Sequence, residues 1–297
     1  MDDLTIHNIP ERPLPYMIAA FAGWADAAES TTRAIRFLNR TLGTQKVAEI
    51  SPEEYYDFTS TRPRTLLDDN GERSIAWPAT DFHAYLPDDD SPGLLLLSGV
   101  EPNLKWKTYC ETVIAIADRY GVELMVTLGS LFNTVPHTRP FPVSSIVSSR
   151  EKLGKRLLDI GAFDSPYQGP TAIHTVLSDL CRQRGLDHIS LWGHGPHYLP
   201  SMPNPKLSYT LLDKVQRLLG IDIALEDLRR AGDRFEQKAT ESIANNGEIV
   251  EYVRRLEEAF DASQTPKPLP DDLTSPDEVI RDLEEFLKSE RNRFDSE

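Results

Sequence analysis

Mostly apolar runs alternate with amphipathic stretches along the first 220 residues, and this alternation limits the possible folds more than any other feature of the chain. Runs without a polar side indicate strands that are buried on both faces. Such runs occupy residues 16–23, 93–100, 123–132 and 188–192. Apolar residues at helical spacing occupy residues 26–42, 106–120, 170–184 and 204–219. The alternation predicts an α/β fold, in which a mostly parallel sheet is sandwiched by helices.

Other segments of the chain depart from this pattern. In residues 51–92, short aromatic pieces are separated by turn residues such as Asp69-Asn70-Gly71, which is typical of a β-hairpin insertion. Beyond the α/β domain of residues 1–221, charged residues with helical spacing predict a helical hairpin at 222–262, which folds back on the domain or on another subunit. A Pro-rich linker and a C-terminal amphipathic helix with a tail are predicted to follow. They occupy residues 263–276 and 277–297.

Charge and cysteine content narrow the classes of partner. The formal net charge is −15, and such a chain repels phosphate backbones and anionic lipids. We therefore expect no nucleic-acid partner and no membrane partner. The N-terminal stretch lacks the features of a signal peptide, and no apolar run is long enough to span a membrane. Cys110 and Cys181 lie in apolar helical stretches, as expected for buried free thiols of a cytoplasmic protein.

The common motifs for nucleotide, metal and nucleophile chemistry are missing, since the sequence has no P-loop, HExxH, GxSxG or paired CxxC. The segment GHGPHY (193–198) begins like a dinucleotide-binding loop, but Tyr198 stands in place of the third glycine. His194 and His197 are separated by Pro196, which is a poor arrangement for zinc ligands. We therefore predict no cofactor and no metal site.

A repeated pattern is more informative than these fragments. The segments VPHTRP (135–140) and GPHYLP (195–200) share the sequence Pro-His-x-x-Pro, and each follows a buried strand that contains glycine. The carboxyl ends of parallel strands meet at one edge of a sheet, where α/β folds place their sites. Two further strand exits lead to the same edge. The four exits contribute the candidate catalytic residues Glu101, His137, His194 and His197 and the candidate ligand-binding residues Trp24, Asp26, Asn103 and Arg139.

Each candidate also has a purely structural interpretation. A Pro-His-x-x-Pro loop can be a rigid turn in which the imidazole binds a backbone carbonyl, and this interpretation is open beside catalysis and metal binding. Asp26 can cap a helix N-terminus, and Arg139 can pair with Glu101 instead of an anionic ligand. Trp24 can be a packing residue. No serine or cysteine lies next to a base in a way that indicates a nucleophile–base pair.

Several segments, taken in order, resemble those of the PAC2 family, the proteins similar to proteasome assembly chaperone 2. They are FAGWADAAESTTRAIRFL (21–38), LSGVEPNLKW (97–106), TLGSLFNTVPHTRP (127–140), GPTAIHTVL (169–177) and GPHYLPSMPNPK (195–206). The chain looks most like the actinobacterial branch, and the resemblance covers about residues 14–260. It implies an α/β sandwich similar to the nucleoside phosphorylase/hydrolase-like fold, with a helical C-terminal part.

The resemblance also implies partners. Eukaryotic and archaeal relatives act as chaperones of proteasome assembly, which implies protein partners for this chain, proteasome subunits among them. It further implies self-association as a homotrimer.

Three functional hypotheses follow. The first is a non-enzymatic assembly chaperone or protein-interaction module, favoured by the resemblance and by the missing nucleophile–base pair. The alternative is a small-molecule-binding enzyme of the nucleoside phosphorylase/hydrolase type, with the histidines, Arg139 and Glu101 around an anionic or purine-like ligand. In the third, the crevice is vestigial and the histidine loops lie in a subunit interface.

Overall fold

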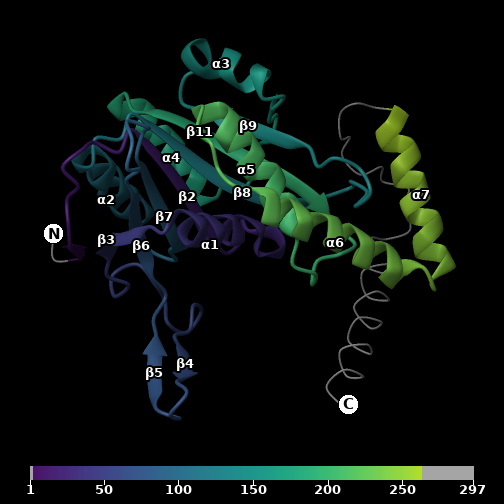
Figure 1. The fold of residues 1–297 in the computed structure, drawn as a ribbon, viewed down its shortest axis with the longest axis horizontal. Helices are drawn as coiled ribbons and strands as arrows, with labels where there is room; N and C mark the ends of the chain where they lie inside the picture. The colour runs from purple at the N-terminus through teal and green to yellow at the C-terminus, as the bar shows by residue number, and fades with distance from the viewer. Residues whose placement is uncertain (1–2, 263–297) are drawn as a thin grey trace.

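The computed structural model describes residues 3–262, and its main element is a nine-stranded sheet (Figure 1). The strand order across this sheet is β1-β3-β6-β7-β2-β8-β11-β9-β10. The strands are β1 (Leu4–Ile6), β2 (Tyr16–Ala22), β3 (Gln45–Ile50), β6 (Thr80–Tyr85), β7 (Leu94–Val100), β8 (Leu124–Asn133), β9 (Val143–Val147), β10 (Phe163–Asp164) and β11 (Asp187–Pro196).

The centre of this sheet is parallel. Strand β2 pairs in parallel with β7 on one side and with β8 on the other, and β8 pairs in parallel with β11. The flanking pairs β1–β3, β3–β6, β6–β7 and β9–β11 are antiparallel. The predicted parallel sheet is thus confirmed for its centre, while its edges are mixed. The carboxyl ends of the four parallel strands meet at one edge, where the candidate residues were expected.

Helices cover both faces of the sheet, as the predicted fold class requires. Helices α2 and α4 share one core cluster with Met17 of β2, and helices α1, α3 and α5 share another with Ile18 of the same strand. Successive side chains of β2 therefore point into two different cores, which explains why the strand is apolar throughout. The helices are α1 (Ser30–Leu42), α2 (Trp106–Arg119), α3 (Arg150–Asp159), α4 (Ile173–Arg184), α5 (Pro205–Leu219), α6 (Glu226–Ile243) and α7 (Gly247–Ala262).

Asp26 explains how the chain enters α1. After β2 the chain forms a short 3-10 helix (Ala27–Glu29) before α1 begins. The Asp26 carboxylate accepts hydrogen bonds from the Thr31 N–H at 2.7 Å, the Thr31 hydroxyl at 2.7 Å and the Thr32 hydroxyl at 2.6 Å. It thereby gives a partner to an amide of the first helical turn, which would otherwise have none. Asp26 thus binds the first turn of α1 as the capping interpretation expects, but Glu29 and not Asp26 stands at the N-cap position, because the helix begins four residues after Asp26.

Two parts extend from the sheet at different ends of the molecule (Figure 1). Strands β4 (Arg64–Leu67) and β5 (Arg73–Ala76) form a separate antiparallel two-stranded sheet, the predicted β-hairpin. Helices α6 and α7 form the predicted helical extension, and α6 packs along α5. None of the helices between residues 3 and 262 is long and apolar enough to cross a bilayer. The predicted linker 263–276 and the C-terminal helix and tail of 277–297 lie outside the described residues.

The segment GHGPHY differs from its prediction. It was expected as a loop that leaves the strand, but β11 continues to Pro196 and includes both glycines. The reason is the close approach of α5. A Cβ atom on Gly193 would lie 2.7 Å from the Leu207 side chain, and a Cβ on Gly195 would lie 3.1 Å from it. The two glycines therefore let the helix pack on the strand, which accounts for the motif without a nucleotide or a metal.

Candidate functional site

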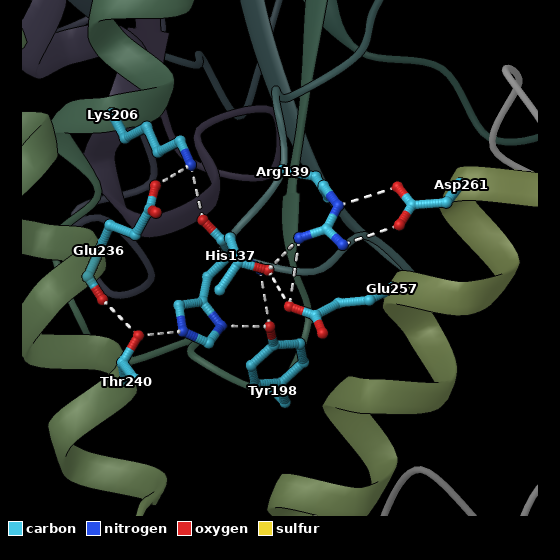
Figure 2. Close-up of polar contacts among 9 residues, drawn as sticks. His137, Arg139, Tyr198, Lys206, Glu236, Thr240, Glu257 and Asp261 are labelled. Carbon is cyan, nitrogen blue, oxygen red and sulfur yellow. Dashed lines mark hydrogen bonds and ion pairs between the residues drawn. The ribbon is translucent and has the colours of Figure 1, made fainter.

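The two Pro-His-x-x-Pro loops lie together, and the C-terminal helices pack against them. Val135 and Phe141 from the first loop share a core cluster with Tyr198 and Leu199 from the second. The remaining members come from α5, α6 and α7, and they are Leu207, Phe235, Ala239, Ile243, Ile249, Tyr252, Val253 and Leu256. We call this region, comprising the two loops and the facing sides of α6 and α7, the loop–helix junction. Figure 2 shows its polar contacts.

His137 is held on both ring nitrogens. The Tyr198 hydroxyl accepts a hydrogen bond from the His137 backbone N–H at 2.8 Å, so its own proton is free to be donated to His137 Nδ1 at 2.7 Å. Nε2 then carries the ring proton and donates it to the Thr240 hydroxyl at 3.0 Å (Figure 2). Burial, reinforced by the nearby positive charge of Lys206, lowers the pKa of His137 to about 4. The ring is therefore neutral at pH 7.

Arg139 pairs with α7 and not with Glu101. Its Nε and Nη2 donate to the two carboxylate oxygens of Asp261 at 2.8 and 2.7 Å, and Nη1 lies 3.4 Å from a Glu257 oxygen (Figure 2). This two-pronged geometry is the one in which a guanidinium recognises a carboxylate best. The hydrogen bonds to Asp261 raise the pKa of Arg139 and lower the pKa of that carboxyl. The expected alternative, pairing with Glu101, is wrong.

Lys206 adds a second link between the loops and α6. Its ammonium group donates to the His137 carbonyl at 2.6 Å and pairs with Glu236 of α6 (Figure 2). It also lies 4.9 Å from the centre of the Phe141 ring, within the range of a cation–π contact. The loop that carries His137 and Arg139 is thus fastened to α5, α6 and α7.

His197 fits the structural interpretation of a Pro-His-x-x-Pro turn. Its Nδ1 donates to the backbone carbonyl of Asn133 at 3.1 Å, and its own backbone N–H donates to the same carbonyl at 3.2 Å. Nε2 then accepts a hydrogen bond from the Tyr252 hydroxyl of α7 at 3.0 Å. Burial lowers the pKa of His197. Both nitrogens of this ring are occupied by the chain itself.

His194 lies in a Ser–His–Asn arrangement that the sequence analysis missed. Its Nε2 is 2.8 Å from the Ser144 hydroxyl and its Nδ1 is 2.8 Å from the Asn133 Nδ2. The expectation that no serine adjoins a base is therefore wrong. Ser144 lies 50 residues away along the chain, on β9, and the antiparallel pairing of β9 with β11 brings the two side chains together. Only the strand order could have revealed this contact.

The tautomer of His194 does not suit a general base. The Thr134 N–H donates to Asn133 Oδ1 at 2.7 Å, which turns the Nδ2 donor of that amide toward His194. Nδ1 is then an acceptor and Nε2 carries the proton, whereas a base for serine needs a free Nε2. Ser144 and His194 are 2% and 7% exposed, so a substrate has no access, and burial lowers the pKa of His194 to about 4.

Two other candidates, Glu101 and Asn103, lie apart from the histidines. In the strand order, Glu101 after β7 is three strands away from β11, which is about 14 Å at the usual strand spacing. Its carboxylate accepts the Ile173 N–H at the start of α4 at 2.8 Å, and burial raises its pKa. Asn103 accepts hydrogen bonds from the Asp57 N–H at 3.1 Å and the Thr61 hydroxyl at 2.9 Å. It thereby holds the loop of residues 57–61. The predicted crevice, lined by all eight candidate side chains, therefore does not form.

Trp24 has no packing role of the kind expected. Its side chain is 61% exposed at the end of β2. Leu104, after β7, is 49% exposed, and Phe132, at the end of β8, is 40% exposed. Because β2 and β8 are neighbours in the sheet, Trp24 and Phe132 belong to adjacent strand ends, and Leu104 lies in the loop that joins the next strand, β7, to α2. We call Trp24, Leu104 and Phe132 the strand-end patch.

Two hollows of the surface are lined by other residues. One of about 480 Å³ is lined by α6 residues, and one of about 500 Å³ is lined by residues between positions 42 and 94 and between 220 and 223. None of the eight candidate residues lines either hollow. Among residues 3–262, no group of three or more histidine, cysteine or acidic side chains is arranged to hold a metal ion.

Comparisons with known proteins place this geometry in a family. The PAC2 family profile matches residues 20–243. A PAC2 family protein from Streptomyces avermitilis is 35% identical with a TM-score of 0.73, and the match covers 80% of this chain and 99% of that one. A proteasome-assembly chaperone homologue from Mycobacterium tuberculosis is 34% identical with a TM-score of 0.72, with the same coverage of 80% and 99%.

A more distant match extends the fold beyond bacteria. An archaeal proteasome activator from Pyrococcus furiosus is 16% identical with a TM-score of 0.64, over 81% of this chain and 99% of that one. At this identity the match shows the fold alone. A search of curated proteins gives no significant match. On the family profile and the two closely similar actinobacterial structures, the chain belongs to the PAC2 family.

Proposed function

We propose that this protein is a non-enzymatic assembly chaperone that binds protein partners, and that proteasome subunits are its partner class. The relative from Mycobacterium tuberculosis is named a proteasome-assembly chaperone homologue and is 34% identical over 80% of the chain. The Pyrococcus furiosus protein with the same fold is named a proteasome activator. These names support a role with the proteasome for the present chain.

The observation that carries the proposal is the strand-end patch. Its three large apolar side chains are 61%, 49% and 40% exposed at or beyond the ends of neighbouring strands. Exposed aromatic and aliphatic groups that gather on one surface are typical of a site for another protein. Near them, the half-buried carboxylate of Glu101 already accepts the Ile173 N–H at the start of α4. A protein surface suits this edge better than a metabolite does.

The enzyme alternative has less support. His137, His194 and His197 use both ring nitrogens within the chain, and Arg139 is paired with two acidic residues. A general base needs a ring nitrogen that is free to take a proton from the substrate. The Ser144–His194 pair is the strongest remaining argument for catalysis, and its tautomer opposes that role.

The proposal also includes an oligomeric state and a cellular location. The resemblance to the PAC2 family favours self-association, with a homotrimer as the expected state. A cytoplasmic location fits the two buried cysteines, which are free thiols.

The test is reconstitution of proteasome assembly. Purified α and β proteasome subunits of the source organism are mixed with and without the full chain, and half-proteasomes and complete particles are quantified by native electrophoresis and peptide hydrolysis. We expect the chain to bind an assembly intermediate and to raise the yield of complete particles.

Variants locate the surface. The double variant Trp24→Ala/Phe132→Ala should lose binding, whereas Leu158→Ala, at a side chain that is 76% exposed on α3, should retain it. If the intact chain binds no subunit and leaves the assembly rate unchanged, the proteasome role is wrong. If both variants bind equally well, the strand-end patch is not the contact.

A further inference from the structure

The turn Asp69-Asn70-Gly71 joins β4 to β5 at the tip of the hairpin that Figure 1 shows projecting from the nine-stranded sheet. The chain contains two Asn-Gly sequences, Asn70-Gly71 in this turn and Asn246-Gly247 at the start of α7. An asparagine loses its side-chain amide most readily before glycine, because glycine has no Cβ to hinder the approach of its backbone nitrogen. The surroundings of the two asparagines therefore decide which of them reacts.

The fold does not hold the side-chain amide of Asn70. This residue is exposed, and its side chain takes part in none of the hydrogen bonds found among residues 3–262. A Cβ atom placed on Gly71 would have no neighbour within 4 Å, so the space around the turn is open. The Asn70 side chain can therefore rotate until its Cγ atom meets the Gly71 nitrogen.

The Gly71 nitrogen is bound by the turn itself. Its N–H donates to the Asp68 carbonyl at 3.0 Å, and the Asp68 carboxylate accepts the Asn70 N–H at 2.9 Å. Every residue of β4 and β5 is exposed except Ala76, which is partly buried. A two-stranded ladder without a packed layer is marginally stable in water. The turn therefore opens far more often than the whole protein unfolds, and each opening releases the Gly71 nitrogen.

Asn246 has the opposite surroundings. It is partly buried, and its Oδ1 accepts the Glu248 N–H at 3.1 Å and the Ile249 N–H at 3.2 Å. These are the hydrogen bonds of a helix N-cap. Ile249 is 4% exposed and belongs to the cluster under the two loops, so the first turn of α7 is fixed by the loop–helix junction. Both cap bonds must break before the Asn246 side chain can turn toward the Gly247 nitrogen.

We propose that Asn70 is a site of spontaneous deamidation in the folded protein and that the N-cap geometry protects Asn246. The Gly71 nitrogen attacks Asn70 Cγ. A bond forms between these two atoms, the Cγ–Nδ2 bond breaks, and ammonia leaves with the proton of the Gly71 N–H. Water then opens the five-membered imide at either carbonyl and yields aspartate or isoaspartate. The reaction needs no reagent other than water, and the inference goes beyond the proposed function because it involves no protein partner.

The product alters both the charge and the length of the turn. A new carboxylate joins Asp68, Asp69 and Glu72, so like charges gather at the tip of the hairpin. Isoaspartate also adds a methylene group to the main chain inside the turn that the Asp68 N–H closes by donating to the Glu72 carbonyl at 3.0 Å. We therefore expect the β4–β5 ladder to be weaker in the modified protein.

The first test follows both asparagines in the intact protein. The full chain is incubated at pH 7.5 and 37 °C, and tryptic peptides are analysed by chromatography and mass spectrometry. The peptide of residues 65–73 should gain one mass unit and separate into aspartate and isoaspartate forms. The peptide of residues 239–254 should change at least about tenfold more slowly, because the cap bonds of Asn246 must break first. Equal rates at the two sites would overturn the inference.

Urea separates the effect of the fold from that of the sequence. In the unfolded chain the two rates should approach each other, because the cap of α7 is lost. An Asn70 that reacts in urea but not in the folded protein would refute the proposed site. An Asn246 that stays slow in urea would refute protection by the cap. The appearance of aspartate without isoaspartate would exclude the imide.

Two variants complete the test. Asn70→Gln should abolish the change in the peptide of residues 65–73, because glutamine would have to form the less favourable six-membered ring. Asn246→Asp is the control, since aspartate also caps a helix, and Asn70 should react in it at the rate of the intact chain. Amide hydrogen exchange then compares the hairpin before and after modification. Faster exchange in β4 and β5 is expected after modification, and unchanged exchange would refute the predicted weakening of the ladder.

Discussion

Buried histidines link the fold of this protein to pH at the scale of single residues. Burial lowers the pKa of His137, His174 and His194 to about 4 and that of His188 to about 3. All four rings are therefore neutral in the folded chain at pH 7, where they donate or accept hydrogen bonds inside the protein. In the unfolded chain each ring binds its proton near pH 6.5.

These shifts predict that stability falls as the pH is lowered from about 6.5 toward 4. In that window the unfolded chain binds more protons than the folded chain, so the free energy of unfolding decreases. Each ring that remains neutral removes about 1.4 kcal/mol for each pH unit, so the four together should remove several kcal/mol of unfolding free energy within the first pH unit below 6.5. Urea unfolding at pH 7.5, 6.5, 5.5 and 4.5 measures the slope.

Two variants control that pH experiment. His194→Gln should make the slope less steep, because one buried ring no longer titrates. Val250→Gln, at an exposed position with no titrating group, should leave it almost unchanged. A free energy of unfolding that stays constant down to pH 4.5 would show that the buried histidines are not neutral in the fold.

The Tyr198 hydroxyl is the second residue-scale test. Tyr198→Phe removes the acceptor of the His137 N–H and the donor to its Nδ1, both in a buried site. Buried groups left without partners cost about 1–3 kcal/mol, and chemical denaturation should show this loss. Tyr167→Phe is the control, since its hydroxyl bonds a carbonyl at an exposed position. Equal stability of the two variants would mean that water replaces the tyrosine hydroxyl in the loop–helix junction.

At the scale of elements, α7 is held by its apolar face. Leu256 is 6% exposed and belongs to the cluster under the two loops, whereas Val250 on the same helix is 42% exposed. Leu256→Asp should destabilise the protein by at least about 3 kcal/mol, because an unpaired carboxylate replaces a packed side chain. Val250→Asp should change the stability by less than about 0.5 kcal/mol. The thermal unfolding midpoint and the rate of limited proteolysis of α7 distinguish the two variants. Similar behaviour of both variants would show that α7 does not pack on the loops.

The elements show which signals a single sequence carries. Strand β2 and helix α5 begin and end within a residue of their predicted bounds, since apolar runs, Asn204 and Gly220 mark them. Strand β11 extends four residues beyond its prediction, to Pro196, because glycine and proline normally indicate a turn. Here the glycines make room for Leu207, and such tertiary packing leaves no local signal in the sequence.

At the scale of the whole molecule, strand order decides which predicted site residues meet. The sequence correctly indicates that several strands end at one edge, but it does not say that β2 and β8 lie between β7 and β11. That order separates Glu101 from the histidines. Contacts over long distances along the chain were also beyond prediction. Arg139 pairs with Asp261, 122 residues away, and His194 meets Ser144 through an antiparallel strand pair.

The closed loop–helix junction leads to a prediction for the whole protein. Nucleosides, inorganic phosphate and phosphate esters at millimolar concentration should leave the thermal unfolding midpoint unchanged, because Arg139 and the three loop histidines are already bound within the chain. A ligand stabilises a protein when it binds the folded state. A ligand concentration a hundred times the dissociation constant would add about 2.7 kcal/mol to the free energy of unfolding. A saturable rise in the midpoint that Arg139→Ala abolishes would contradict this expectation. Such a rise would mean that Asp261 releases the guanidinium to an anion, and the crevice would then have to be considered as an active site that α7 covers.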